Sequence, residues 1–200
     1  MTSDLSGSRP QAEREPRHRL FFALWPDETM RDALAHSVRK AVRASGGRPV
    51  AADKLHVTLA FLGAVPESRL TALADAARAA SRERPRVAPL LELPLERLEY
   101  WTGPSLLCVL PEQPPPGVTA LAQRLLERLA AAGFAPDLKP FRPHVTVARK
   151  VTRATPSLAM RSAVWRLSGF ALIESRTLES GSVYSVVQSF PLVGNDSTEK

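Results

Sequence analysis

The chain has little of several features that would assign it to a class of protein. It has a single cysteine, Cys108, among 200 residues, which excludes a disulfide framework and any metal site built from several cysteines. No apolar run approaches the ~18 residues that cross a bilayer. The first residues include Asp4 and lack the apolar segment of a secretory signal. These absences predict a cytoplasmic protein with no membrane partner.

Positive charge is in excess. The sequence has 27 Lys and Arg against 20 Asp and Glu, a net charge of +7. Because residues 1–16 and residues 194–200 each sum to −1, the residues between them carry +9. A basic body favours an anionic partner such as a polynucleotide or a phosphate ester. The positive charge can also follow from GC-rich coding, which favours arginine, since 22 of the 27 basic residues are Arg. Charge alone does not decide between these two explanations.

The composition divides the chain into a folded domain and two polar ends. Residues 1–16 are rich in Ser, Pro and charge and predict a disordered leader, and residues 194–200 predict a flexible tail. Within the domain, residues 17–193, hydrophobic periodicity predicts one helix capped by Asp27, a second opened by Pro66 and a third that follows the prolines at 114–116. Strands are predicted at residues 20–25, 55–62, 87–98, 106–110, 144–149, 164–174 and 183–192. Gly63 is expected to end the second of these strands.

Helices and strands alternate only loosely, and the last third of the domain is rich in strands. This order favours an α+β fold with mixed or antiparallel sheets over a doubly wound parallel sheet.

One pentapeptide occurs almost twice. His56-Val57-Thr58-Leu59-Ala60 and His144-Val145-Thr146-Val147-Ala148 begin 88 residues apart, at positions 56 and 144. Each follows a predicted strand, a helix and a loop. We interpret this as two lobes related by a pseudo-twofold axis, with helices on the outer faces and a central groove.

Strand parity indicates where these side chains point. His56 and Thr58 share one face of a strand, and Val57 and Leu59 share the other. If the aliphatic face packs on the helices, each lobe presents an imidazole and a hydroxyl to the groove. The same parity places Phe61 in the core. In the second motif it places Lys150 on the His144 face and Arg149 on the opposite face.

Paired imidazoles suit acid–base catalysis better than metal binding. A metal site needs three or four ligands, and the two candidates for the remaining positions, Asp53 and Asp137, lie in loops at unmatched offsets. A serine nucleophile at a strained turn is not indicated, since no Gly-x-Ser-x-Gly occurs. One neutral and one protonated imidazole can take and give a proton near neutral pH. Thr58 and Thr146 can donate hydrogen bonds to phosphate oxygens, so the sequence predicts a site with no metal and no cofactor.

The remaining candidates have ordinary structural explanations. His18 is expected at the edge of the leader and His36 on an exposed helix face. Phe21, Phe22 and Trp25 can stack on a base, although an apolar strand of this kind is usually part of a core.

The sequence resembles the two-histidine phosphoesterases, and within them the RNA 2′,3′-cyclic phosphodiesterases once described as 2′-5′ RNA ligases. The resemblance covers about residues 18–192. It rests on the segments Arg19–Leu24, Leu55–Gly63, Phe141–Arg149 and Tyr184–Leu192.

The resemblance implies a bilobal fold and hydrolysis of RNA terminal 2′,3′-cyclic phosphates to 2′-phosphates without a cofactor. By the same likeness, His56 is expected to donate a proton to the leaving 3′-oxygen and His144 to activate water. Thr58 and Thr146 would hold the phosphate, with Arg142, Arg149 and Lys150 as further candidates for substrate binding. The expected partner is an RNA 3′ end or a nucleotide with a cyclic phosphate, bound by a monomer.

Three alternatives stay open. The same four residues would serve the reverse reaction, which joins RNA ends with a 2′-5′ linkage. A small cyclic phosphate, such as a cyclic ADP-ribose phosphate, is a related substrate. A non-catalytic module that binds RNA ends is less favoured, because Arg or Lys would bind a phosphate better than paired His and Thr do.

Overall fold

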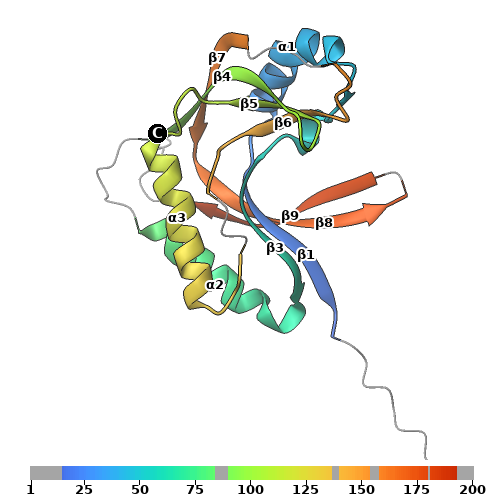
Figure 1. The fold of residues 1–200 in the computed structure, drawn as a ribbon. Coiled ribbons are helices and arrows are strands. Elements are labelled where there is room, and N and C mark those ends of the chain that lie inside the picture. The colour runs from blue at the N-terminus through green and yellow to red at the C-terminus, as the bar shows by residue number, and fades with distance from the viewer. Residues whose placement is uncertain (1–14, 84–89, 137–139, 154–157, 180, 193–200) are drawn as a thin grey trace, which may run out of the picture.

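The computed structural model describes residues 15–83, 90–136, 140–153, 158–179 and 181–192. Most of the expected leader and the whole expected tail therefore lie outside the described residues, as does Asp137. The elements follow the order β1 (Arg17–Leu24), α1 (Glu28–Ala44), β2 (Arg48–Pro49), a 3-10 turn (Ala52–Lys54), β3 (Val57–Pro66), a 3-10 turn (Glu67–Arg69), α2 (Leu70–Arg82), β4 (Leu91–Trp101), β5 (Leu106–Leu110), α3 (Pro116–Ala131), β6 (Val145–Arg149), β7 (Leu158–Leu167), β8 (Gly169–Leu178) and β9 (Gly181–Pro191) (Figure 1).

The strands form two separate antiparallel sheets. Sheet A has the order β3-β1-β8-β9 and sheet B the order β2-β6-β5-β4-β7. In each sheet a strand leads through a helix to an antiparallel neighbour that carries a His-x-Thr motif, β1-α1-β3 in sheet A and β5-α3-β6 in sheet B. The prediction of a two-lobed α+β fold is confirmed.

The two motif strands also share an irregularity. In sheet A, Phe22 pairs with Ala60 and Ala23 pairs with Thr58, so Leu59 has no partner on β1. In sheet B, Leu107 pairs with Ala148 and Cys108 with Thr146, and the residue skipped is Val147. A β-bulge therefore follows the threonine in both lobes.

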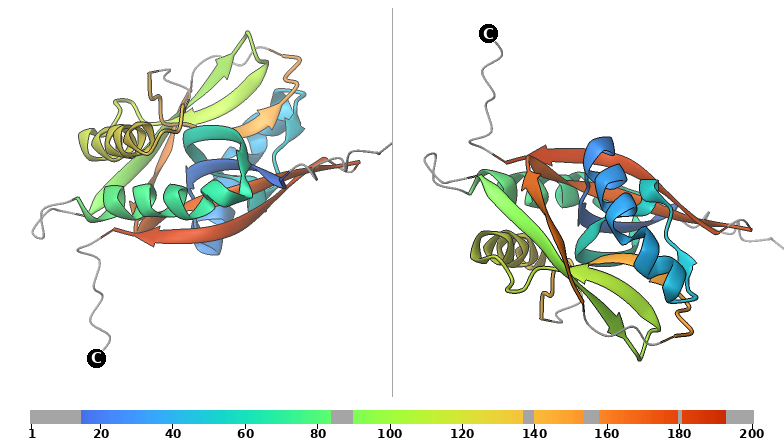
Figure 2. Two further views of the ribbon diagram at one scale, coloured as in Figure 1. Left: turned by 90° about the horizontal axis from the view of Figure 1, so that it is seen from below. Right: turned by 90° about the horizontal axis from the view of Figure 1, so that it is seen from above.

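Asp27 starts α1 as predicted, because its carboxylate accepts a hydrogen bond from the Met30 amide at 2.7 Å. Helix α1 lies against sheet B, whereas α2 and α3 pack side by side at the other end of the molecule (Figures 1 and 2). None of the described helices has the length and hydropathy that a membrane span requires.

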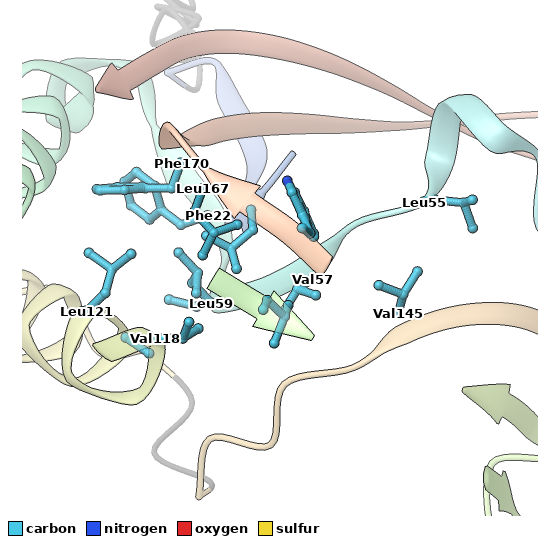
Figure 3. Packing of buried hydrophobic residues seen from close by; sticks show 14 of the residues in the cluster. Phe22, Leu55, Val57, Leu59, Val118, Leu121, Val145, Leu167 and Phe170 are labelled. Carbon is cyan, nitrogen blue, oxygen red and sulfur yellow. The ribbon is translucent and has the colours of Figure 1, made fainter. Parts of the chain in front are cut away.

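The core joins the two lobes. Side chains from both motif strands, Val57, Leu59 and Val145, pack in one cluster with Phe22 and with apolar residues of α3 such as Leu121 (Figure 3). All five are at most 5% exposed. The aliphatic face of each motif strand is therefore in the core, as parity predicts.

The single strand predicted over residues 164–174 is wrong. The chain changes sheets there: β7 ends at Leu167 in sheet B and β8 begins at Gly169 in sheet A. A Cβ atom at Gly169 would lie 2.5 Å from the Phe190 carbonyl oxygen, so only glycine allows this approach. Periodicity does not detect the change, because both strands are apolar.

The prediction that Gly63 ends its strand is also wrong. Gly63 has a φ of 67°, which glycine tolerates, and β3 continues through it to Pro66. Strand β1 also starts earlier than expected, at Arg17. Just before it, the Glu67 amide donates to the Pro16 carbonyl and the Ser68 amide to the Glu15 carboxylate.

Candidate active site

A cleft of about 800 Å³ lies between the two sheets. His56 and Thr58 line it from the β3 side, and His144 and Thr146 line it from the β6 side. None of its described lining residues comes from α1, α2 or α3. The structure thus brings the four residues of the paired motif to one cleft, on the sheet faces that the helices leave open.

The two imidazoles are held in the same way. His56 Nδ1 lies 2.7 Å from the Lys54 carbonyl oxygen, and His144 Nδ1 lies 2.8 Å from the Arg142 carbonyl oxygen, in each case two residues earlier. A carbonyl only accepts, so Nδ1 carries the proton and donates it. In both rings Nε2 is left to exchange a proton with a substrate.

Aromatic rings surround His56. The Phe21 ring lies 5.1 Å from the imidazole centroid, Trp25 stacks on it at 5.6 Å, and Tyr184 meets it edge-on at 5.5 Å. Phe21 and Tyr184 also line the cleft. Phe22, on the opposite face of β1, is fully buried. Of the three aromatic candidates, Phe22 lies in the main core, Phe21 is buried in a second apolar cluster, and both Phe21 and Trp25 contact the imidazole.

Among the described residues, one aromatic ring contacts His144, and Glu99 and Arg142 hold that ring in place. The Trp101 ring lies 4.4 Å from His144, and the Arg142 guanidinium lies over the same indole at 4.8 Å. Glu99 accepts from Arg142 at 2.6 and 2.8 Å and from the Trp101 indole N–H at 2.8 Å. Arg97 pairs with the same carboxylate at 2.8 Å.

Both histidines have a lowered pKa. Burial is the main cause at His56 and at His144, and the hydrogen bond to a backbone carbonyl partly opposes it. The positive charge of Arg149 lowers the pKa of both rings, and that of Arg142 also lowers the pKa of His144. Both imidazoles therefore favour the neutral form more strongly than a free histidine does.

The threonines occupy equivalent positions with different neighbours. Thr58 pairs across the sheet with Ala23, whereas Thr146 pairs with Cys108. The Cys108 sulfur lies 3.9 Å from the Thr146 hydroxyl oxygen. Burial raises the pKa of the Cys108 thiol to about 11, so it stays protonated.

The bulges reverse the parity beyond each threonine. Leu59 and Ala60 are both buried, so Phe61 faces the cleft and is 59% exposed. Val147 and Ala148 are likewise both buried, and Arg149 faces the cleft. The core position predicted for Phe61 and the opposite face predicted for Arg149 are therefore wrong, for one reason. The sequence does contain a signal for each bulge, since two apolar residues stand side by side after each threonine, Leu59-Ala60 and Val147-Ala148.

The lining of the cleft is strongly basic. Lys150 lies in it together with Arg149, whereas Arg142 is bound to Glu99 and is not among its lining residues. Three cations that sequence analysis did not single out also line the cleft: Arg19, Arg48 and Lys54. No Asp or Glu is among its described lining residues.

The remaining predictions concern metal binding and the other histidines. Within the described ranges, no group of three or more His, Cys, Asp or Glu could hold a metal ion. Asp53 is exposed, and so is His36, as predicted. His18 is the second residue of β1, and its Nδ1 is 2.9 Å from the Glu174 carboxylate.

Two lobes that each bring a His-x-Thr pair to one basic cleft define a two-histidine phosphoesterase. The 2′-5′ RNA ligase superfamily model matches residues 27–178. The chain is 36% identical over 140 residues to the RNA 2′,3′-cyclic phosphodiesterase of Escherichia coli (strain K12), covering 70% of this chain and 76% of that protein. It is 34% identical over 193 residues to the enzyme of the same name from Thermus thermophilus, covering 91% and 94%.

Solved structures agree with these matches. The crystal structure of E. coli LigT complexed with NADP+ has a TM-score of 0.77 at 29% identity, covering 88% of this chain and 99% of that one. The crystal structure of TT0787 of Thermus thermophilus has a TM-score of 0.72 at 28% identity, covering 88% and 99%. The chain belongs to the 2′-5′ RNA ligase superfamily.

Proposed function

We propose that this protein hydrolyses the 2′,3′-cyclic phosphate at an RNA 3′ end to a 2′-phosphate, with two imidazoles and no metal. The observation that carries this proposal is the equivalent placement of His56 and His144, whose Nδ1 atoms are fixed while both rings line one cleft. Two relatives, 36% and 34% identical to this chain, are named RNA 2′,3′-cyclic phosphodiesterase. Such a ring phosphate is an activated diester and needs only a proton donor and a base.

The surroundings of the histidines support a division of roles. His144 has two arginine charges acting on it, Arg142 and Arg149, which favour the neutral imidazole that a base must be. His144 Nε2 would take a proton from water as the water oxygen bonds to phosphorus. His56 Nε2 would give a proton to the 3′-oxygen as the bond from phosphorus to that oxygen breaks. Each turnover therefore leaves the two histidines with their protonation exchanged.

Thr58 and Thr146 are proposed to donate hydrogen bonds to the two non-bridging phosphate oxygens. As charge builds on these oxygens in the transition state, hydroxyl donors and the nearby Arg149 guanidinium stabilise it. Phe61 exposes an apolar ring in the same cleft and can stack on the terminal base.

The test is the product formed from an oligonucleotide with a 2′,3′-cyclic phosphate end in excess EDTA. We expect a 2′-phosphate at an undiminished rate, identified by chromatography against both isomers. A 3′-phosphate product would contradict the assigned leaving group. Loss of activity in EDTA that one divalent metal restores would contradict the metal-free mechanism.

A further inference from the structure

The basic residues of the cleft are not evenly spread. Arg48, on the short edge strand β2, pairs directly opposite Arg149 on β6, and both side chains line the cleft. Residues directly opposite in an antiparallel pair have Cβ atoms about 5 Å apart on one face of the sheet. Lys150 follows Arg149 and lines the same region. Three cations therefore converge at this wall, which we call the basic wall (Arg48, Arg149 and Lys150).

Within the part of the chain that the structure describes, no carboxylate pairs with the basic wall. In the same sheet, Arg97 pairs with Glu99 at 2.8 Å and Arg166 pairs with Glu92 at 3.2 Å. Among the residues with described positions, none of the three wall cations forms an ion pair. Like charges directly opposite each other destabilise a sheet.

The position of the wall is fixed by the backbone. Beyond the Arg48–Arg149 and Pro49–Ala148 pairs, the Val50 amide donates to the Val147 carbonyl at 2.9 Å. Lys150 has a φ of 52°, an uncommon conformation for a residue with a side chain. The Val151 amide that follows is tied to the Ser105 carbonyl at 3.0 Å. The cations are thus held together by backbone pairing in spite of their repulsion.

We propose that the basic wall is a second anion subsite, which binds the phosphodiester of the nucleotide that precedes the cyclic end. This inference rests on the proposed function and adds to it a contact with the preceding phosphodiester, which makes a dinucleotide a better substrate than a mononucleotide. The cyclic phosphate itself carries one negative charge, which the threonines, the histidine pair and Arg149 already meet. Arg48 and Lys150 supply two further positive charges beside Arg149. Among the described strands, β2, which carries Arg48, has no counterpart beside β3 in sheet A. The basic wall is therefore an addition to the repeated His-x-Thr arrangement.

The first experiment compares three substrates that share one terminal base. These are a nucleoside 2′,3′-cyclic phosphate, the same compound with a 5′-phosphate, and a dinucleotide with a 2′,3′-cyclic phosphate. We expect kcat/KM to rise about tenfold or more from the first to the third, since charge-assisted contacts are among the stronger hydrogen bonds. The 5′-phosphorylated compound should recover most of the rise, because it supplies the anion without a second base. A rise for the dinucleotide alone would assign the gain to the base and overturn the proposal.

Salt provides a second readout. The dependence of log kcat/KM on log salt concentration should be steeper for the dinucleotide by about 0.7 than for the nucleoside cyclic phosphate, as for one additional single-strand phosphate contact. Equal slopes would overturn the subsite.

The variant is Arg48→Gln, with Arg166→Gln as a matched control on an exposed arginine of the same sheet. Arg48→Gln should lower the ratio of the dinucleotide to mononucleotide kcat/KM by about tenfold and reduce the difference in salt slope. Arg166→Gln should leave the ratio unchanged. Because Arg48 opposes Arg149, Arg48→Gln should not lower the melting temperature. An equal loss on both substrates, with a lower melting temperature, would show that Arg48 is structural and overturn the proposal.

These outcomes separate the subsite from the reaction. If no substrate of the three is hydrolysed, the proposed function fails. If all three are hydrolysed with the same kcat/KM and salt slope, the reaction stands and the subsite alone fails.

Discussion

The backbone around the two histidines is arranged in the same way, whereas the side chains that contact the two imidazoles differ. His56 is enclosed by three rings, Phe21, Trp25 and Tyr184, whereas His144 rests on Trp101 beside the ion pair of Arg142 and Glu99. Each Nδ1 is bound to the carbonyl two residues before it, and each motif is followed by a bulge. A duplicated backbone can therefore place two equivalent imidazoles while the side chains around them differ, and the proposed division into proton donor and base rests on those side chains.

The largest expected effect comes from removing each imidazole in turn. His56→Ala and His144→Ala should each lower kcat by ~10²–10⁴, and the double variant should be little worse than the worse single variant, because the two act as a unit. A cyclic phosphate with a much better leaving group should restore activity to His56→Ala and not to His144→Ala, since only His56→Ala lacks a proton for the departing oxygen. Steady-state kinetics on both substrates test this. Equal rescue of both variants would contradict the roles and leave the site intact.

A smaller effect is expected from the support of His144. Glu99→Gln removes the carboxylate that binds both Arg142 and the Trp101 indole, so the indole beside His144 is held less firmly. We expect kcat to fall about tenfold with little change in KM, since misplacement of a catalytic group slows the chemical step. Glu92→Gln is the matched control, because Glu92 lies on the same strand and pairs with Arg166. A fall in kcat shared by both variants would indicate a general loss of stability.

The pH dependence of kcat/KM should separate the effect of Arg149, which lowers the pKa of both histidines, from that of Arg142, which lowers the pKa of His144. Because both histidines have a pKa below the ordinary value of 6.5, the bell of kcat/KM should have its maximum on the acid side of neutrality. The limbs belong to the coupled pair. Arg149→Gln should move both limbs to higher pH, since Arg149 lowers the pKa of both rings. Arg142→Gln should move the acid limb alone, because Arg142 acts on His144, the proposed base. Movement of the alkaline limb by Arg142→Gln would contradict that assignment.

The sequence was enough to predict the fold and the repeated motif that the two lobes share, but not the side-chain contacts in which the lobes differ. The repeat at 56 and 144 and the apolar alternation were enough to predict two lobes and to place the His and Thr side chains in one cleft. Alternation counts residues in steps of two, so it fails beyond a bulge, as it did for Phe61 and Arg149. Alternation also does not predict contacts between residues far apart in the sequence, such as those of Tyr184 with His56 and of Glu99 with Arg142. These depend on which strands the fold brings together, as does the opposition of Arg48 and Arg149 across an edge strand two residues long.

The smallest expected effect is on the pH dependence of stability, and its size at His56 and at His144 compares how strongly each lobe keeps its imidazole neutral. The pKa values of His56 and His144 are lower in the folded protein than in the unfolded chain. As the pH falls below 6.5, these histidines therefore bind more protons in the unfolded chain than in the folded protein. The free energy of unfolding should therefore fall from pH 7.5 to pH 5.5. Glu99 and Glu174, whose pKa values are below 4.5, keep their contributions across this interval. The double variant lacking both imidazoles should lose less stability than the wild type between the two pH values, by urea unfolding. His56→Ala should account for the larger part, because three rings shield His56 from water. A loss in the double variant as large as in the wild type would show that neither histidine is held neutral by its surroundings.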